Sequence, residues 1–398
     1  MKIVVVGSVA AGTSVAAKAR RNTEDAHIVI YDRDRDISYS GCGLPYYVGG
    51  EVDDIDDLRP RDAAWFAKRY HVAIHTRHEV THVDHAARTV TVHRLDSAET
   101  VTDTYDVLVL ATGVSSIVPP IPGVGSPGVF TLRSPSDAEE IRAFADRWQP
   151  ERAVIVGAGY IGLEMAEQLV ERGMQVTVVE AQNHAMPRMD PDMSARVDET
   201  LRGHGVDLRT GASVTAIDGE TAVQSVTVDG ERLPADLVVL AVGVRPNLEL
   251  ARQIRVATGP TGAIAVDTRM RTSVDGVYAV GDVAESFSAI TGEPVWVPLG
   301  STANKMGRIA GHVITGGDLE HRRDPRHLDR AGVRHRGRHD RHDRDRRSGC
   351  GLRRRGAAQH QARPFGVPRR EATDHQGRRR PGHVPSARRP GHRATRGG

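Results

Sequence analysis

The chain has 398 residues, of which 39% are hydrophobic and 26% charged, and its formal net charge at pH 7 is +3. This length allows two or three domains with sizeable cores, and no apolar run is long enough to span a membrane. Only two cysteines are present, which excludes a disulfide framework and favours a reducing, cytoplasmic setting.

Strand and helix signals alternate from the start of the chain, which predicts an α/β fold with parallel sheets. We expect strands over residues 3–6, 27–32 and 105–111, and a helix over 10–21. The opening strand is too short for a secretory signal and has no cleavage site.

A glycine-rich turn at residues 7–12 joins the first strand to the first helix. Its two glycines permit a tight turn and close helix–strand packing, and the amides between them can bind a pyrophosphate. Ala10 stands near the place of the usual middle glycine, so a glycine turn in an unrelated α/β domain is the alternative. An acidic residue ends the next strand and can bind a ribose hydroxyl. The candidate cofactor contacts are Gly7, Ala10, Ala11, Gly12, Asp32 and Arg33.

The pattern restarts after residue 152, with strands predicted over 153–156 and 175–180 around a helix over 160–172. The turn between them reads Gly-Ala-Gly-Tyr-Ile-Gly, a complete dinucleotide fingerprint. The acid that closes the second strand suits the 2′-hydroxyl of NADH, and no arginine directly follows it to bind a 2′-phosphate. The candidate contacts are Gly157, Gly159, Tyr160, Ile161, Gly162 and Glu180.

Three predicted strands end at a glycine. The strand over 105–111 runs into Thr112-Gly113, a strand over 237–242 into Gly243, and a strand over 277–280 into Gly281-Asp282. An aspartate in the last position can accept hydrogen bonds from a ribityl chain while backbone amides hold phosphate, although it can also simply cap a helix. The last predicted helix covers residues 302–314.

Residues 320–398 differ from the rest of the chain, because they contain 24 arginines, no lysine, eight acidic residues and no Ile, Met, Tyr or Trp. Little in this stretch can build a core, so we predict a disordered tail over 319–398. We interpret its composition as a translated wrong reading frame and its cysteine, Cys350, as incidental. The remainder is acidic, so the net charge of the whole chain does not indicate nucleic-acid binding.

Residues 272–282 resemble the second FAD motif of the pyridine nucleotide–disulfide oxidoreductases, and residues 111–113 and 241–243 are similar to the hinge motifs of that family. The resemblance covers about residues 1–322. It implies FAD and NADH or NADPH as cofactors, two Rossmann-like domains with the second inserted in the first, and a C-terminal dimerisation domain that the tail replaces. The implied domains are an FAD-binding domain of residues 1–118 and 246–318 and an NAD(P)H-binding domain of residues 119–245.

Cys42 is the one cysteine ahead of the tail, and it lies between the two fingerprints. A buried cysteine is commonly inert packing, but in this setting a lone thiol indicates a flavin-linked reductase that works with one sulfur. The Cys-x4-Cys and Cys-x2-Cys pairs of other branches of the family are not possible here. Residues 37–50 resemble the coenzyme A-disulfide reductase branch, apart from Gly41, where that branch usually has asparagine.

The resemblance implies that NADH or NADPH reduces FAD, that the flavin reduces Cys42, and that Cys42 attacks CoA disulfide. Tyr160 resembles the residue that shields the flavin and Glu164 a nicotinamide-side acid; the alternatives are a packed aromatic side chain and a surface charge. No metal is expected. The CoA contacts implied by resemblance, which otherwise form a solvated surface, are Ser14, Lys18, Arg21, Ser38 and Asn304.

Other functions remain open at this point. An NADH oxidase or a persulfide/polysulfide reductase uses the same flavin and thiol, so the residues do not choose among these activities. A second hypothesis is a truncated flavoprotein that binds FAD without forming the family's homodimer or turning over. A nucleic-acid anchor in the tail ranks last, because its arginines lack aromatic interleaving. The expected partner is a small-molecule disulfide, with no membrane partner.

Overall fold

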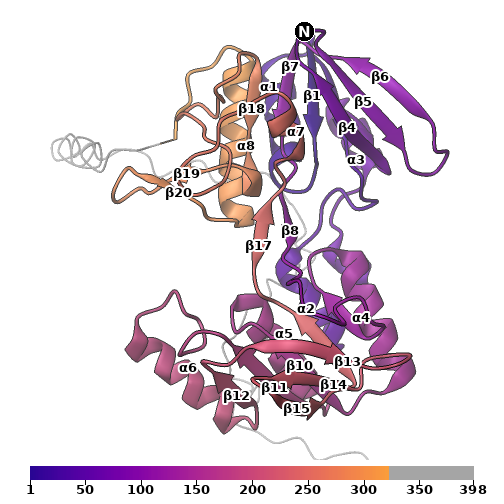
Figure 1. The fold of residues 1–398 in the computed structure, drawn as a ribbon. Helices are drawn as coiled ribbons and strands as arrows, with labels where there is room; N and C mark the ends of the chain where they lie inside the picture. Colours follow the sequence, from indigo (N-terminus) through magenta and orange to yellow (C-terminus); the bar gives the residue numbers. More distant parts are fainter. Residues whose placement is uncertain (322–398) are drawn as a thin grey trace, which may run out of the picture. The chain divides into compact units, whose positions relative to one another are not determined.

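The computed structural model describes residues 1–321, so the predicted tail lies outside the described residues from residue 322 on. Two parallel sheets of five strands dominate the fold, which confirms the predicted α/β class (Figure 1). The first sheet has the order β18 (Val277–Ala279), β7 (Val107–Leu110), β1 (Lys2–Val6), β2 (His27–Tyr31) and β3 (Ala73–His75). The second has the order β12 (Asp207–Thr210), β11 (Gln175–Glu180), β10 (Arg152–Val156), β16 (Leu237–Leu240) and β9 (Val129–Thr131).

The second sheet is built from an insertion in the first. All of its strands lie in the chain between β7 and β18, which are neighbours in the first sheet. The chain leaves the first sheet through β8 (Val114–Ser116) and returns through β17 (Val244–Pro246), and these two strands pair antiparallel. The predicted domain limit at 118/119 lies two residues after β8, and the limit at 245/246 lies within β17.

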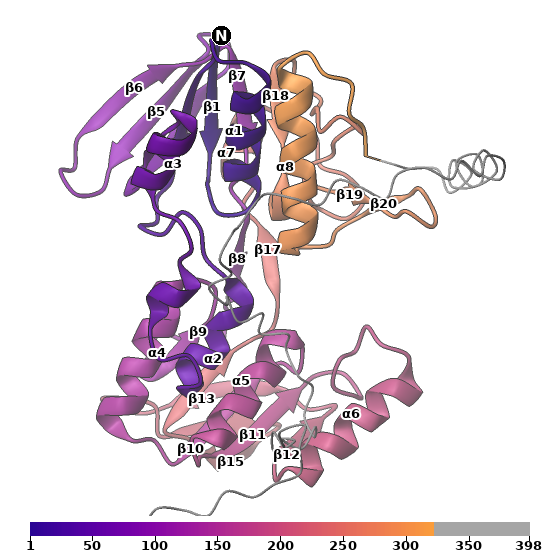
Figure 2. The ribbon, with the colours of Figure 1, turned by 180° about the vertical axis from the view of Figure 1, so that it is seen from behind.

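The core of the first sheet follows from its apolar strands. Ile3, Val4 and Val5 of β1 are fully buried, as expected for a parallel strand covered on both faces. Helices α1 (Ala11–Asn22) and α8 (Gly300–Ile314) lie side by side (Figure 2). A Cβ on Gly307 would lie 2.4 Å from the Ala11 carbonyl oxygen, so this close helix contact requires glycine.

The second sheet carries α4 (Pro135–Trp148), α5 (Tyr160–Glu171) and α6 (Pro191–Gly203). Helix α4 begins with a capping box formed by Ser134 and Asp137. The short helix α2 (Leu44–Gly49) comes from residues far ahead of this sheet, yet it packs against α4 and α5. The sequence patterns did not predict that contact.

Two small antiparallel sheets were also not predicted. One contains β4 (His78–Asp84), β5 (Thr89–Arg94) and β6 (Thr100–Thr104), and the other β13 (Val214–Asp218), β14 (Ser225–Val228) and β15 (Glu231–Pro234). In β5 two buried valines alternate with less buried residues, the pattern of a strand with one covered face. The remaining short elements are α3 (Ala63–Tyr70), α7 (Glu249–Gln253), β19 (Ser286–Phe287) and β20 (Pro294–Val295).

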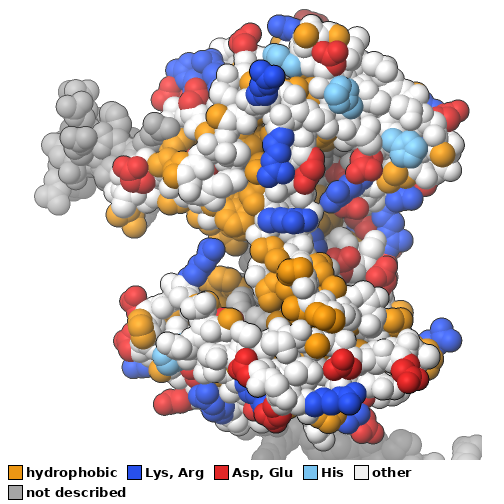
Figure 3. Space-filling view, in the orientation of Figure 1, with side chains coloured by type: hydrophobic (Ala, Val, Ile, Leu, Met, Phe, Trp, Pro, Cys, Tyr) orange, Lys and Arg blue, Asp and Glu red, His pale blue; other side chains and the backbone are white. Residues whose placement is uncertain are grey.

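Apolar side chains reach the surface beside β19, β20 and the start of α8 (Figure 3). Ile290 is 84% exposed, and Val297 and Leu299 are also exposed. Within residues 1–321, every helix is too short or too polar to cross a bilayer.

Candidate active site

The first glycine-rich turn is packed tightly against its own backbone. Gly7 has φ of +96°, and a Cβ there would lie 2.2 Å from the Ala111 carbonyl oxygen. A Cβ on Gly12 would lie 1.9 Å from the Gly7 carbonyl oxygen. Only glycine fits these two positions, so α1 begins directly against the end of β1. The N-cap residue of α1 is Ala10, whose side chain cannot cap the first amides, among them that of Ala11.

Asp32 lies directly behind this turn. One of its carboxylate oxygens accepts the Ser8 N–H at 2.7 Å and the Ser8 hydroxyl, and the other accepts the Asp34 N–H at 2.9 Å. Burial raises the pKa of Asp32, and the hydrogen bonds from Ser8 oppose that shift. A carboxylate has lone pairs left for a ribose hydroxyl. Arg33, the neighbouring candidate, is exposed.

The middle position of this turn differs from the predicted one. Counted from the first glycine, Val9 stands where Gly159 stands in the second turn, and Ala10 is one residue further on. Val9 has φ of +27°, a conformation that β-branched residues rarely adopt. The imperfect position of the fingerprint is therefore Val9.

The second glycine-rich turn repeats the same geometry. Gly157 has φ of +104°, a Cβ there would lie 2.4 Å from the Ala241 carbonyl oxygen, and one on Gly162 would lie 2.0 Å from the Gly157 carbonyl oxygen. Glu180 accepts the N–H groups of Ala158 at 2.8 Å and Gln182 at 2.9 Å. These contacts hold the second turn in the same backbone geometry as the first.

The start of α5 is open to solvent. Gly159 is its N-cap residue, Tyr160 is 69% exposed and Ile161 is 38% exposed. Glu164, one turn further along, is partly buried, and burial followed by the charge of Glu167 raises its pKa. The Tyr160 ring therefore lies at the surface, directly after the second glycine-rich turn.

Gly281 and Asp282 belong to the C-terminal part of the described residues, and Gly281 packs against the first glycine-rich turn. Gly281 has φ of +78°, and a Cβ there would lie 2.8 Å from the Ala11 side chain. Asp282 follows in a short 3₁₀ turn, and its carbonyl oxygen accepts the Trp296 Nε1–H at 2.8 Å. Burial raises the pKa of the Asp282 carboxyl, and the positive charge of Arg133 acts in the opposite direction.

Arg133 is a site residue that the sequence patterns missed. It donates from Nη1 to the Tyr39 hydroxyl at 3.0 Å, and its Nη2 would lie 3.4 Å from a Cβ on Gly113. Its Nε is buried and has no hydrogen-bond partner within residues 1–321. A cationic donor close to Gly113 and near enough to Asp282 to affect its pKa suits an anionic dinucleotide, so these residues fit FAD. The available signal was an arginine directly ahead of the α4 capping box.

The two strands that link the sheets are tied together by Asn247. Its side-chain N–H donates to the Thr112 carbonyl oxygen at 2.8 Å, while the Thr112 hydroxyl donates to the Asn247 carbonyl oxygen at 2.9 Å. Gly243 has φ of +111°, and its carbonyl oxygen accepts the Ile117 N–H at 2.9 Å. The Thr112 hydroxyl and the Asn247 side chain therefore hold the two linking strands together.

Cys42 lies in a 3₁₀ turn, Gly41–Gly43, that runs directly into α2. It is the one cysteine in the part of the chain that the structure describes, and it is exposed. Partial burial of the thiol, followed by the negative charge of Glu164, raises the pKa of Cys42. The side chains around the sulfur thus favour the neutral thiol, whereas the expected chemistry needs the thiolate.

The C-terminal end of α2 is held by two arginines from the helices of the second sheet. Arg142 of α4 donates from Nη1 to the carbonyl oxygens of Tyr47 at 3.1 Å and Val52 at 2.9 Å. Arg172 at the end of α5 donates to the Val48 carbonyl oxygen at 2.8 Å. Cations at this end of a helix satisfy its free carbonyls and favour its dipole. These contacts fix the helix that follows Cys42.

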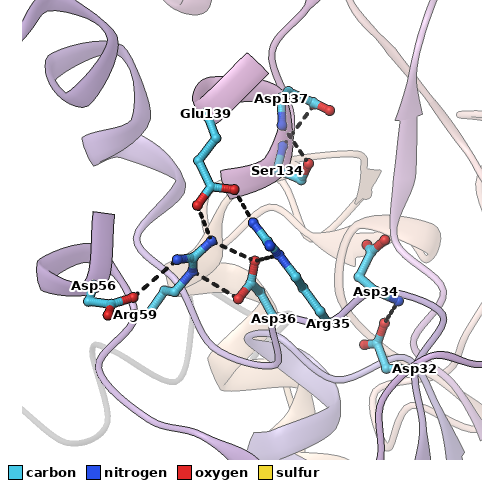
Figure 4. Close-up of polar contacts among 9 residues, drawn as sticks. All are labelled: Asp32, Asp34, Arg35, Asp36, Asp56, Arg59, Ser134, Asp137 and Glu139. Atoms are coloured by element: carbon cyan, nitrogen blue, oxygen red, sulfur yellow. Dashed lines mark hydrogen bonds and ion pairs between the residues drawn. The ribbon is translucent and has the colours of Figure 1, made fainter. Parts of the chain in front are cut away.

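An ion-pair network joins both ends of the segment that contains Cys42 (Figure 4). The Arg59 guanidinium contacts Asp36 at 2.8 Å, Glu139 at 3.0 Å and Asp56 at 3.1 Å, and Arg35 also contacts Glu139. Because Arg59 is only 18% exposed in its side chain, these pairs are less screened than those on an open surface. The network attaches residues 36–59 to α4.

Three of the five predicted CoA contacts line one cavity of about 380 Å³. These are Ser14, Arg21 and Asn304, and the Ser14 hydroxyl donates to the Asn304 side-chain oxygen at 2.6 Å. The described residues that line the cavity do not include Lys18 or Ser38. The lining residues that sequence reasoning missed include Arg61, Trp65 and Arg308.

Comparisons with known proteins agree with this geometry. The family described as pyridine nucleotide-disulphide oxidoreductase matches residues 1–307. The chain is 38% identical over 320 residues, 80% of this chain and 71% of the relative, to an NAD(P)H sulfur oxidoreductase (CoA-dependent) of Pyrococcus furiosus. It is 36% identical to an NADH oxidase of Methanocaldococcus jannaschii and 31% identical to a coenzyme A disulfide reductase of Staphylococcus haemolyticus, each over 79% of this chain and 70% of the relative.

Solved structures show the same fold. An NAD-dependent persulfide reductase from A. fulgidus matches with a TM-score of 0.78 and 39% identity, over 81% of this chain and 60% of that one. The reduced Bacillus anthracis CoADR-RHD matches with a TM-score of 0.77 and 38% identity, over 79% of this chain and 57% of that one. This chain thus spans less than two thirds of either structure. From its matched residues and its two dinucleotide turns, the chain belongs to the pyridine nucleotide-disulphide oxidoreductase family of FAD-dependent NAD(P)H oxidoreductases.

Proposed function

We propose that this chain reduces coenzyme A disulfide, or a related low-molecular-weight disulfide, with NADH or NADPH as the electron source and Cys42 as the reacting thiol. The observation that carries the proposal is the position of Cys42. It precedes a helix that α4 and α5 hold in place, and the charge of Glu164 on α5 reaches its thiol. Because α5 begins at the second dinucleotide turn, the thiol lies near the helix that would bind the nicotinamide nucleotide.

A bound FAD would supply the two-electron chemistry that links oxidation of the nicotinamide to reduction of a disulfide. The steps that this chain's own residues carry out begin with the Cys42 thiolate, which attacks one sulfur of the substrate. An S–S bond forms between Cys42 and one half of the substrate, and the other half leaves as a thiolate. Two electrons and one proton then cleave this mixed disulfide, which releases the second thiol and restores the Cys42 thiolate.

The cavity lined by Ser14, Arg21 and Asn304 supports a phosphate-bearing substrate. Arg21, Arg61 and Arg308 supply cationic donors for the phosphates of CoA. Trp65, which lies under the Arg61 guanidinium at 4.6 Å, offers a flat ring for a nucleobase. We expect Arg21→Ala to raise KM for CoA disulfide while leaving KM for a disulfide without phosphates unchanged.

The direct test uses the purified full chain with FAD. NADH oxidation and thiol release are measured with CoA disulfide as the acceptor. Cys42→Ser is expected to reduce thiol release about a hundredfold or more while the protein keeps its flavin absorbance, and Cys350→Ser serves as the matched control with unchanged activity. Unchanged thiol release by Cys42→Ser would contradict the proposal, and FAD binding without turnover by the parent chain would favour the non-catalytic alternative.

A sulfur acceptor is the second candidate substrate. It is favoured by the names of two similar proteins, the sulfur oxidoreductase of P. furiosus and the persulfide reductase of A. fulgidus. The same thiol can attack a polysulfide, and a reduced flavin can also pass electrons to oxygen. The ratio of kcat/KM for CoA disulfide, polysulfide and oxygen decides among the three activities, and we expect the first to be largest.

A further inference from the structure

Tyr46 carries a hydroxyl group whose oxygen is buried. It lies four residues after Cys42, in one continuous run of helical backbone that passes through Gly41–Gly43 into α2. At this spacing two side chains lie on the same side of a helix. The Tyr46 hydroxyl oxygen is buried and has no hydrogen-bond partner among residues 1–321. Such groups are rare in folded proteins, and a role in the chemistry is one physical reason for them.

The charges around Tyr46 keep its proton in place. Burial, followed by the negative charges of Glu164 and Glu167 on α5 and of Glu51 after α2, raises the pKa of Tyr46 to about 12. The cations that α4 and α5 place on α2, Arg142 and Arg172, bind carbonyl oxygens at its C-terminal end. The Tyr46 hydroxyl therefore stays a hydrogen-bond donor at neutral pH.

Cys42 lacks what Tyr46 can supply. Burial and Glu164 both favour its neutral thiol, and α2 is only six residues long, so its dipole is small. A phenolic O–H donated to a thiolate is a charge-assisted hydrogen bond, which is stronger than one between neutral groups. The Tyr46 hydroxyl, which has no hydrogen-bond partner among residues 1–321, and the Cys42 sulfur thus belong to side chains one helical turn apart.

We propose that the Tyr46 hydroxyl donates a hydrogen bond to the Cys42 sulfur when that sulfur is a thiolate, and so keeps the nucleophile ionised at neutral pH. The proton stays on the Tyr46 oxygen throughout, so no atom or electron is exchanged. The inference rests on the proposed function, because it assigns Tyr46 to the same reacting sulfur.

The test measures the Cys42 thiolate directly, without turnover. In the FAD-loaded, prereduced protein with Cys350→Ser, Cys42 is the single thiol, and its rate of alkylation by iodoacetamide against pH gives a midpoint. Tyr46→Phe is expected to raise that midpoint by about one unit and to slow alkylation at pH 7 about tenfold. Tyr47→Phe is the matched control, because the Tyr47 ring instead lies under the Arg142 guanidinium at 4.4 Å. Equal midpoints in the two variants would overturn the proposal.

A second variant covers the case in which Tyr46→Phe does not fold. Replacement of Tyr46 by 3-fluorotyrosine keeps the ring and makes the hydroxyl a stronger donor, so the midpoint is expected to fall. A midpoint that stays or rises overturns the proposal. The two hypotheses fail separately, because thiol release by Cys42→Ser tests the proposed function and alkylation tests only the hydrogen bond.

Discussion

The two dinucleotide turns share one frame and differ in what covers them. In each, the first glycine lies against a carbonyl oxygen at the end of a neighbouring strand, and the acid at the end of the second strand accepts the N–H that follows this glycine. In the first turn, Ala11 is 7% exposed and Gly281 lies against it. In the second, the matching Ile161 and its neighbour Tyr160 are exposed. The covered turn suits a cofactor that stays bound, and the open one suits a nucleotide that exchanges.

The largest effect is expected from placing alanine at the first glycine of either turn. Gly7→Ala introduces a Cβ 2.2 Å from a carbonyl oxygen at positive φ, and we expect a loss of about 3 kcal/mol in stability together with the flavin. Gly157→Ala should cost a similar amount but leave FAD bound. Thermal unfolding and flavin absorbance measure both outcomes.

Gly159→Ala is the control for these variants. Gly159 has φ of −83°, and a Cβ there would meet no heavy atom of the described residues within 4 Å. The melting temperature of Gly159→Ala should equal that of the parent chain. Its affinity for NADH should fall, because the added methyl group lies where the backbone approaches pyrophosphate. Equal destabilisation by all three variants would remove the basis of the comparison.

The two acids should separate the two cofactors. Asp32→Ala is expected to lower FAD affinity about tenfold or more, whereas Glu180→Ala should raise KM for NADH by a similar factor and leave FAD content unchanged. Glu220→Ala removes an exposed acid from the same half as Glu180 and should do neither. Loss of FAD in Glu180→Ala would contradict the assignment of the halves.

Loosening the helix behind Cys42 should have a smaller effect. Arg142→Ala removes the donor shared by the Tyr47 and Val52 carbonyls, so we expect kcat to fall about tenfold with little change in KM for NADH. Arg147→Ala is a matched control on the same helix, because its guanidinium lies over the exposed Trp148 ring at 5.0 Å. Steady-state kinetics with CoA disulfide distinguishes the two variants.

The smallest expected effect is on stability against pH. Burial raises the pKa of Glu164, so its ionisation costs stability as pH rises through the ordinary carboxyl range. Glu164→Gln should therefore melt at a higher temperature than the parent chain at pH 7. The two proteins should melt at the same temperature at about pH 3, where the Glu164 carboxyl is neutral in both the folded and the unfolded parent chain. A Glu164→Gln variant that is less stable at pH 7 would contradict the raised pKa.

The features that sequence predicted are local ones. The strands and helices around residues 7–12 and 157–162 follow from glycine spacing and continuous apolar runs, and the structure places them within two residues of the predicted limits. The antiparallel sheets were missed because short alternating runs such as β5 compete with loop signals. Periodicity within one segment contains no information about β5 pairing with β4 and β6.

The missed site residues depend on contacts between distant segments. Arg133, Arg142 and Arg172 act on residues about 90 to 125 positions away, such as Tyr39 and Val48. Nothing in the sequence in or beside α4 and α5 distinguishes these arginines from solvated ones such as Arg147. Cys42, in contrast, could be proposed from sequence because a single thiol between two fingerprints is recognisable without any knowledge of contacts.

The insertion has a consequence for the order of assembly. The strand β18 and the helix α8, which complete the first sheet and its glycine-lined helix contact, are synthesised only after the whole of the second sheet. During translation the inserted half can reach its native topology first, while the strands made earliest still lack an edge partner and a covering helix. The sheet that contains the residues translated first is therefore the last to be completed.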